Sequence, residues 1–136
     1  MSTSKTTRVF TGSRKTARAQ VYISRGKGLV TVNGVSLEIL QPEASRLKII
    51  QTLLVGRDVA KKFDIEIRVS GGGFMGQAEA ASIAIARALV GVSKSKRLEK
   101  LYREFDRTLI AGDSRRTEPK KFGGPGPRRR KQKSYR

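Results

Sequence analysis

The sequence predicts an α+β domain in which a mainly antiparallel sheet carries helices on one face, followed by an extended basic C-terminal tail. Three observations lead to this prediction: one run alternates apolar and polar residues, one Asn-Gly pair separates two β-prone runs, and three segments show helical patterns. Several strands precede a helix, a strand and two more helices, an order typical of an α+β fold. We place the domain at residues 1–111 and the tail at residues 112–136.

The clearest strand is FDIEIRVS at residues 63–70, which puts four apolar side chains on one face and four polar ones on the other. TARAQVYIS, which ends at Ser24, predicts an earlier strand, and TRVFTG is a candidate for a shorter one before it. Asn33 and Gly34 lie between two β-prone runs. Asn-Gly predicts a tight hairpin there because both residues tolerate a positive φ.

A first helix is predicted from about residue 42 to residue 55. Pro42 suits the first helical position, and Gly56 can take the left-handed conformation that ends a helix. Periodic apolar residues usually mark the face that a helix turns toward the core. In this segment the apolar stripe consists of Leu47, Ile50, Leu53 and Leu54.

Two further helices are predicted after the alternating strand. Residues 74–90 contain no proline and are rich in alanine, which favours a helix and lets it lie close to a sheet. In residues 98–109, apolar residues recur at intervals of three and four among charged ones, which predicts an amphipathic helix with a solvated face.

The composition limits the function more than the fold. Thirty Lys and Arg against eleven Asp and Glu give a net charge of +19, which makes nucleic acid the first candidate partner and an anionic membrane surface the second. No run is long and apolar enough for a membrane span or a signal peptide, so we expect a soluble, cytoplasmic protein without a membrane partner. The absence of Cys and His removes thiolate, zinc-finger and imidazole chemistry.

The positive charge is concentrated at the two ends of the chain. Residues 1–37 carry seven Lys and Arg and no acid, residues 38–111 carry thirteen against nine, and residues 112–136 carry ten against two. The last segment has no apolar period and contains three Pro and four Gly, so it lacks the apolar surface needed to offset the entropy of ordering. A basic tail of this kind is suited to following closely spaced phosphates.

Gly71, Gly73 and Gly76 have the spacing G-x-G-x-x-G between a predicted strand and a predicted helix. One interpretation is a dinucleotide fingerprint, but the second parallel strand and the acidic residue that hold the ribose are missing from the following residues. A second interpretation is structural, since glycine permits a tight turn and a close approach of backbones. A third is that the N–H groups of Gly72 and Gly73 hold an RNA phosphate.

Two other groups of residues are candidates for chemistry. Asp64 and Glu66 lie two apart on a predicted strand, which suits paired-carboxylate or metal chemistry but equally the solvated face of a strand. Without histidine or an obvious third ligand, we build no active site on them. Arg14, Lys15 and Arg18 lie between two predicted strands and are candidates for phosphate contacts.

Three separated segments carry a family resemblance: TGSRKTARAQV, RVSGGGFMGQAEAASIAIARALV and DSRRTEPKKFGGPGPRRRKQKSYR. Together they closely resemble the family of the universal ninth protein of the small ribosomal subunit. KKFGGPG and the terminal QKSYR are similar to its archaeal and eukaryotic branch, and the short N-terminus is similar to archaeal members. The resemblance covers nearly the whole chain in the right order.

The resemblance implies a fold similar to the second domain of small-subunit ribosomal protein five. It also implies a non-catalytic protein without a cofactor or small-molecule substrate, bound to ribosomal RNA and to neighbouring proteins in the head of the small subunit. The end of the tail would approach transfer RNA in the peptidyl site through Lys133, Ser134, Tyr135 and Arg136. The candidate contacts to ribosomal RNA are Arg14, Lys15, Arg18, Gly72, Gly73, Arg115, Arg116, Lys120, Lys121, Arg128, Arg129, Arg130 and Lys131.

Two other classes of function fit parts of the sequence. An enzyme could bind a nucleotide through the glycine loop, and it would then bind NAD or ATP tightly. A sequence-neutral nucleic-acid packaging protein would fit the charge equally well, and it would bind duplex DNA as tightly as ribosomal RNA.

Overall fold

A five-stranded sheet and the helices stacked on it make up the fold seen in the computed structural model, which describes residues 7–112 and 122–123. The strands are β1 (Arg8–Arg14), β2 (Ala17–Arg25), β3 (Val30–Val32), β4 (Val35–Ser36) and β5 (Phe63–Ser70). The helices are η1 (Leu37–Ile39), α1 (Glu43–Val55), α2 (Arg57–Ala60), α3 (Phe74–Ser93), α4 (Lys96–Phe105) and α5 (Thr108–Ala111).

The sheet has the strand order β1-β2-β5-β3-β4. Three of its neighbouring pairs are antiparallel, as the sequence predicted, but β3 and β5 run parallel, so the sheet is mixed. A parallel pair needs a long crossover, which β4, η1, α1 and α2 provide. The Asn33-Gly34 hairpin is confirmed between β3 and β4, with φ of 50° and 81° at the two residues.

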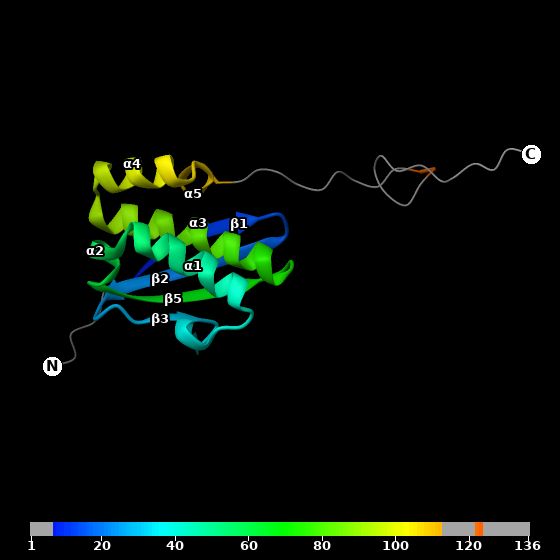
Figure 1. Cartoon of the computed structure of the whole chain (residues 1–136), viewed down its shortest axis with the longest axis horizontal. Helices are drawn as coiled ribbons and strands as arrows, with labels where there is room; N and C mark the ends of the chain where they lie inside the picture. Colours follow the sequence, from blue (N-terminus) through cyan, green and yellow to red (C-terminus); the bar gives the residue numbers. More distant parts are fainter. Residues whose placement is uncertain (1–6, 113–121, 124–136) are drawn as a thin grey trace, which may run out of the picture.

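The elements form three layers, as Figure 1 shows. α1 and α3 cover one face of the sheet, and α4 and α5 lie beyond α3, away from the strands. Apolar side chains of β2 and β5 alternate toward the helices, and Val21, Ile23, Ile65 and Ile67 are fully or almost fully buried there. The prediction that helices pack on one face of the sheet is therefore confirmed.

α3 lies unusually close to the strands. The alanines predicted to allow this are all buried, and a Cβ at Gly12 of β1 would lie 2.6 Å from the carbonyl oxygen of Ala80 and 2.7 Å from the amide nitrogen of Ala84. The helix backbone therefore rests almost directly on β1. Although α3 has 20 residues, none of the helices between residues 7 and 112 is long and apolar enough to cross a membrane.

The predicted core face of α1 is wrong for two of its four residues, since Ile50 and Leu53 pack half-buried against the core but Leu47 and Leu54 do not. The buried residues of α1 are Ser45, Ile49 and Thr52, whereas Leu47 is 48% and Leu54 61% exposed. α1 packs against the alanine-rich α3, and a close approach to that helix requires small side chains. The hydroxyls are satisfied locally: Ser45 donates to the carbonyl of Phe74 and Thr52 to that of Lys48. Ile49 is buried between Ser45 and Thr52, while Leu47 and Leu54 lie on the outer surface of α1.

Gly56 follows the end of α1, as predicted, but it does not take the left-handed conformation. Its φ is −103°, outside the left-handed region. A Cβ at this position would lie 2.7 Å from the hydroxyl oxygen of Tyr102, so the position has no room for a side chain. Tyr102 is completely buried, and its hydroxyl donates a 2.7 Å hydrogen bond to the carbonyl of Thr52. The contact joins α4 to the C-terminal end of α1.

The amphipathic segment predicted over residues 98–109 is divided into two helices. α4 starts at the cap residue Ser95, whose hydroxyl accepts from the N–H of Leu98, and it ends at Asp106, which is extended with φ of −159°. The carboxylate of Asp106 then accepts from the N–H of Thr108 at the start of α5. This break turns Leu109 into the core and leaves Phe105 exposed.

Replacing Gly12 with Ala should destabilise the protein by about 1–3 kcal/mol, because the added methyl group collides with the backbone of α3. Chemical denaturation of the full chain measures the change. Ser13→Ala is the matched control, since Ser13 is the exposed neighbour in the same strand, and it should change the unfolding free energy by no more than about 0.5 kcal/mol. Equal stability of G12A and the wild type would contradict the close packing.

Replacing Tyr102 with Phe should cost about 1–3 kcal/mol at neutral pH, because the buried carbonyl of Thr52 loses its donor. Burial also raises the pKa of Tyr102 well above its usual range. The unfolded tyrosine ionises from about pH 10 while the folded one stays neutral, so this stabilisation is complete below that pH and is lost as the pH rises. The stability gap between wild type and Y102F should therefore shrink in denaturation curves recorded above pH 10.

Candidate nucleic-acid interface

The β1–β2 turn and the glycine loop meet at one end of the sheet. Lys15 and Thr16 form the turn, and Lys15 has a positive φ of 53°. A Cβ at Gly71 would lie 2.5 Å from the carbonyl oxygen of Thr16, and one at Gly72 would lie 3.2 Å from the Cβ of Ala17. Two segments that are far apart in the sequence, each with predicted RNA contacts, are thus brought together.

The glycine loop makes a turn that connects β5 to α3. Gly71 and Gly72 have φ of 74° and 64°, a conformation that glycine adopts far more readily than other residues. Gly73 is the N-cap of α3, and the side-chain amide of Gln77 donates to the carbonyl of Gly71. α3 leads into α4, so the second parallel strand of a dinucleotide fold is missing from this region, as the sequence indicated.

This end of the sheet is suited to an anion. The first turn of α3 contains no acidic residue, and the first N–H groups of a helix carry partial positive charge without an intrahelical acceptor. Within the described residues, no hydrogen bond engages the N–H groups of Gly72 and Gly73. Lys15 and Arg18 are exposed beside the loop, and Arg18 is paired in register with Ser70. Cations and backbone donors therefore gather at one exposed place.

Arg14 differs from its two neighbours. Its Nε lies 2.7 Å from a carboxylate oxygen of Glu79 on α3, and only 14% of its side chain is exposed. With Lys48, Glu79 and Asp106 it lines a cleft of about 80 Å³. Arg14 therefore ties β1 to α3, and its contact with RNA stays a prediction, whereas Lys15 and Arg18 remain exposed to a partner.

The two carboxylates of β5 have different surroundings. Asp64 is half-buried and accepts from the backbone N–H groups of Lys27 and Leu29, which fixes the loop between β2 and β3. Glu66 is exposed and pairs with Arg68 at 3.2 Å. Throughout residues 7–112 and 122–123, no group of three or more acidic residues could hold a metal ion. Both carboxylates therefore have structural partners.

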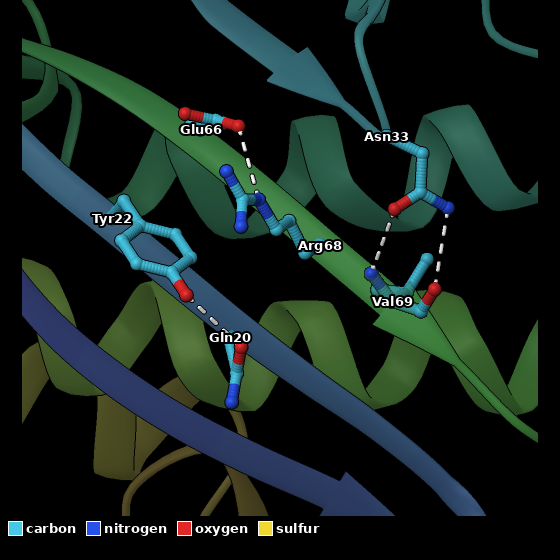
Figure 2. Close-up of polar contacts among 6 residues, drawn as sticks. All are labelled: Gln20, Tyr22, Asn33, Glu66, Arg68 and Val69. Carbon is cyan, nitrogen blue, oxygen red and sulfur yellow. Dashed lines mark hydrogen bonds and ion pairs between the residues drawn. The ribbon is translucent and has the colours of Figure 1, made fainter.

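Sequence reasoning missed a group on the open face of the sheet, shown in Figure 2. Tyr22 lies beside Arg68, whose guanidinium carbon is 4.7 Å from the centre of the ring, and the tyrosine hydroxyl donates to Gln20. The alternation of TARAQVYIS could have revealed it, because positions 18, 20 and 22 share one face of a strand.

Every predicted contact in the tail lies outside the described residues. For ribosomal RNA these are Arg115, Arg116, Lys120, Lys121, Arg128, Arg129, Arg130 and Lys131, and for transfer RNA they are Lys133, Ser134, Tyr135 and Arg136. Their roles stay predictions, as does the division of the chain at residues 111 and 112.

We call the end of the sheet with the exposed Lys15 and Arg18 the basic end. The fold and this basic end define an α+β protein with the kind of surface that binds nucleic acid. The sequence model of the family Ribosomal protein S9/S16 matches residues 12–136. Small ribosomal subunit protein uS9 of Saccharolobus solfataricus is 52% identical over 129 residues, which cover 94% of each chain. The same protein of Thermoplasma acidophilum is 49% identical over 128 residues, covering 94% of this chain and 99% of the relative. The chain belongs to this family.

Family membership confirms the resemblance read from the sequence, including its archaeal character. The chain is therefore a ribosomal protein of the small subunit, in a structural family that is not enzymatic. Membership implies a role in translation and binding to ribosomal RNA.

Proposed function

We propose that the domain binds ribosomal RNA of the subunit head through the end of the sheet where the β1–β2 turn meets the glycine loop. The observation that carries this proposal is the exposure of Lys15 and Arg18 beside the N-terminus of α3, whose first turn lacks an acid. The two side chains neutralise phosphates and release counterions, while the N–H groups of Gly72 and Gly73 bind a phosphate directly. The protein acts in cytoplasmic ribosomes, among neighbouring head proteins.

The role we propose is structural rather than catalytic, without a cofactor or small-molecule substrate. Acid–base chemistry at neutral pH most often uses histidine, which the chain does not contain. The glycine loop is accounted for by the turn into α3 and by its contact with the β1–β2 turn. The protein therefore contributes binding and position to the ribosome.

We further propose that the basic tail follows ribosomal RNA toward the peptidyl site and that its tip holds transfer RNA. The tip ends in Lys133, Ser134, Tyr135 and Arg136, which offer two cations, a hydroxyl and an aromatic ring. The guanidinium of Arg136 is the group suited to bind a phosphate there. A tail that neutralises about six phosphates gives log K against log salt a slope of roughly −4 to −5.

The double variant Lys15→Gln with Arg18→Gln should weaken binding to an RNA comprising the head of the small-subunit ribosomal RNA. It should also make the slope of log K against log salt shallower by roughly 1.4 to 1.8, because two phosphate contacts are lost. Filter binding at several salt concentrations measures both quantities. Lys100→Gln with Arg103→Gln, which removes two exposed cations from α4, is the control and should leave the slope unchanged. Equal slopes for both double variants would contradict the proposed interface. If the wild type bound duplex DNA as tightly as the RNA of the head, a sequence-neutral packaging function would be favoured instead.

Removing Ser134–Arg136 should leave folding and incorporation into the small subunit intact, because the described hydrophobic core is formed by residues between Phe10 and Ile110. It should weaken retention of transfer RNA in the peptidyl site, measured as a faster dissociation rate from purified subunits. A truncation that removes residues 1–3 instead is the control. Unchanged dissociation from subunits with the shortened tail would show that the tip does not hold transfer RNA.

A further inference from the structure

The sheet has one face that no described helix covers, and its outward side chains follow a regular order. Arg18, Gln20 and Tyr22 point outward from β2, and their register partners on β5 are Ser70, Arg68 and Glu66. Figure 2 shows Tyr22, Gln20, Arg68 and Glu66 on the two central strands, with the helices behind the sheet. The face is therefore continuous with the exposed Arg18 of the basic end.

Arg68 is held in place but remains open to a partner. Its Nε donates to Glu66 at 3.2 Å, and its guanidinium lies over the ring of Tyr22 at 4.7 Å from the centroid. Despite both contacts, 60% of the Arg68 side chain is exposed. Two contacts already restrain this long side chain. Arg68 therefore loses little further side-chain entropy when a partner packs on it.

The charges on this face select the chemistry of the partner. Glu66 cancels the charge of Arg68, so the pair attracts a phosphate only weakly. The carboxylate of Glu66 would also repel an acidic protein segment. What the face offers is the exposed guanidinium of Arg68 over the Tyr22 ring, beside the amide of Gln20 and the hydroxyl of Tyr22. Nucleobases stack on tyrosine rings and on arginine planes, and their edges form hydrogen bonds with amides.

We propose that Arg68 and Tyr22 form a stacking platform for an unpaired base of ribosomal RNA. The inference rests on the proposed function, because the same RNA strand would be held by its phosphates at Lys15 and Arg18. Arg18 and Tyr22 are four residues apart on one face of β2, which corresponds to about 13 Å along the strand. Phosphate contacts at the end of the sheet thus give affinity, and the platform receives a base.

The test compares single variants of the full chain for binding to the RNA of the subunit head at several salt concentrations. Tyr22→Ala should lower the affinity by about 5- to 100-fold, the range measured for loss of one base stack. Arg68→Lys should also lower it, because lysine keeps the charge but has no planar group. Neither change removes a phosphate contact, so the salt slope should stay that of the wild type. Tyr22→Phe keeps the ring and should bind within a few-fold of the wild type.

Arg103→Lys is the matched control for Arg68→Lys, because Arg103 is equally exposed, at 61%, and pairs with Glu99 on α4. Thermal melts establish that each variant is folded, and R68K carries the test if Y22A does not fold. The platform would be overturned if folded Y22A and R68K bound the RNA as tightly as the wild type. It would also be overturned if their slope of log K against log salt were reduced as in the Lys15 and Arg18 double variant. If the platform variants bind normally while that double variant binds weakly, the proposed function stands and only the platform fails.

Discussion

The fold depends on the backbone of α3 lying directly on β1. At Gly12, a single added carbon would meet backbone atoms of Ala80 and Ala84, and the surrounding positions of α3 are mostly alanine. Alanine buries little apolar surface, so the large buried side chains of the neighbouring strands and of Ile85 and Leu89 must supply most of the hydrophobic stabilisation. On α1, which packs against α3, the small residues Ser45 and Thr52 are buried together with Ile49.

The same contact fixes the candidate site. With α3 held against β1, the N-terminus of α3 and the β1–β2 turn end at the same edge of the molecule, and the salt bridge from Arg14 to Glu79 joins them from the inside. Arg14 therefore stabilises the arrangement, while Lys15 and Arg18 beside it are exposed to solvent. Loop glycines that resemble a cofactor motif serve here to bring two distant segments into contact.

Much of the fold and part of the candidate site could be predicted from the sequence, and the wrong predictions have physical reasons. Local patterns were reliable: the alternation of β5, the Asn33-Gly34 turn and the alanine-rich α3 were all read correctly. The core face of α1 was predicted only in part, because it depends on packing against α3, which the periodicity of α1 alone does not contain. The pairing of Arg14 with Glu79 joins residues far apart in the chain, so local sequence patterns could not predict it. The break at Asp106 had a local signal, since an aspartate side chain readily accepts a hydrogen bond from the backbone N–H two residues on, as Asp106 does from Thr108.

We propose above that the end of the sheet at Lys15 faces ribosomal RNA. Acetylation of lysines in intact small subunits and in the free protein, compared residue by residue by mass spectrometry, tests it most directly. We expect Lys15 to be protected in the subunit, to regain reactivity after digestion of the RNA, and to react readily in the free protein, where it is exposed. Equal reactivity of Lys15 in the subunit and in the free protein would contradict it.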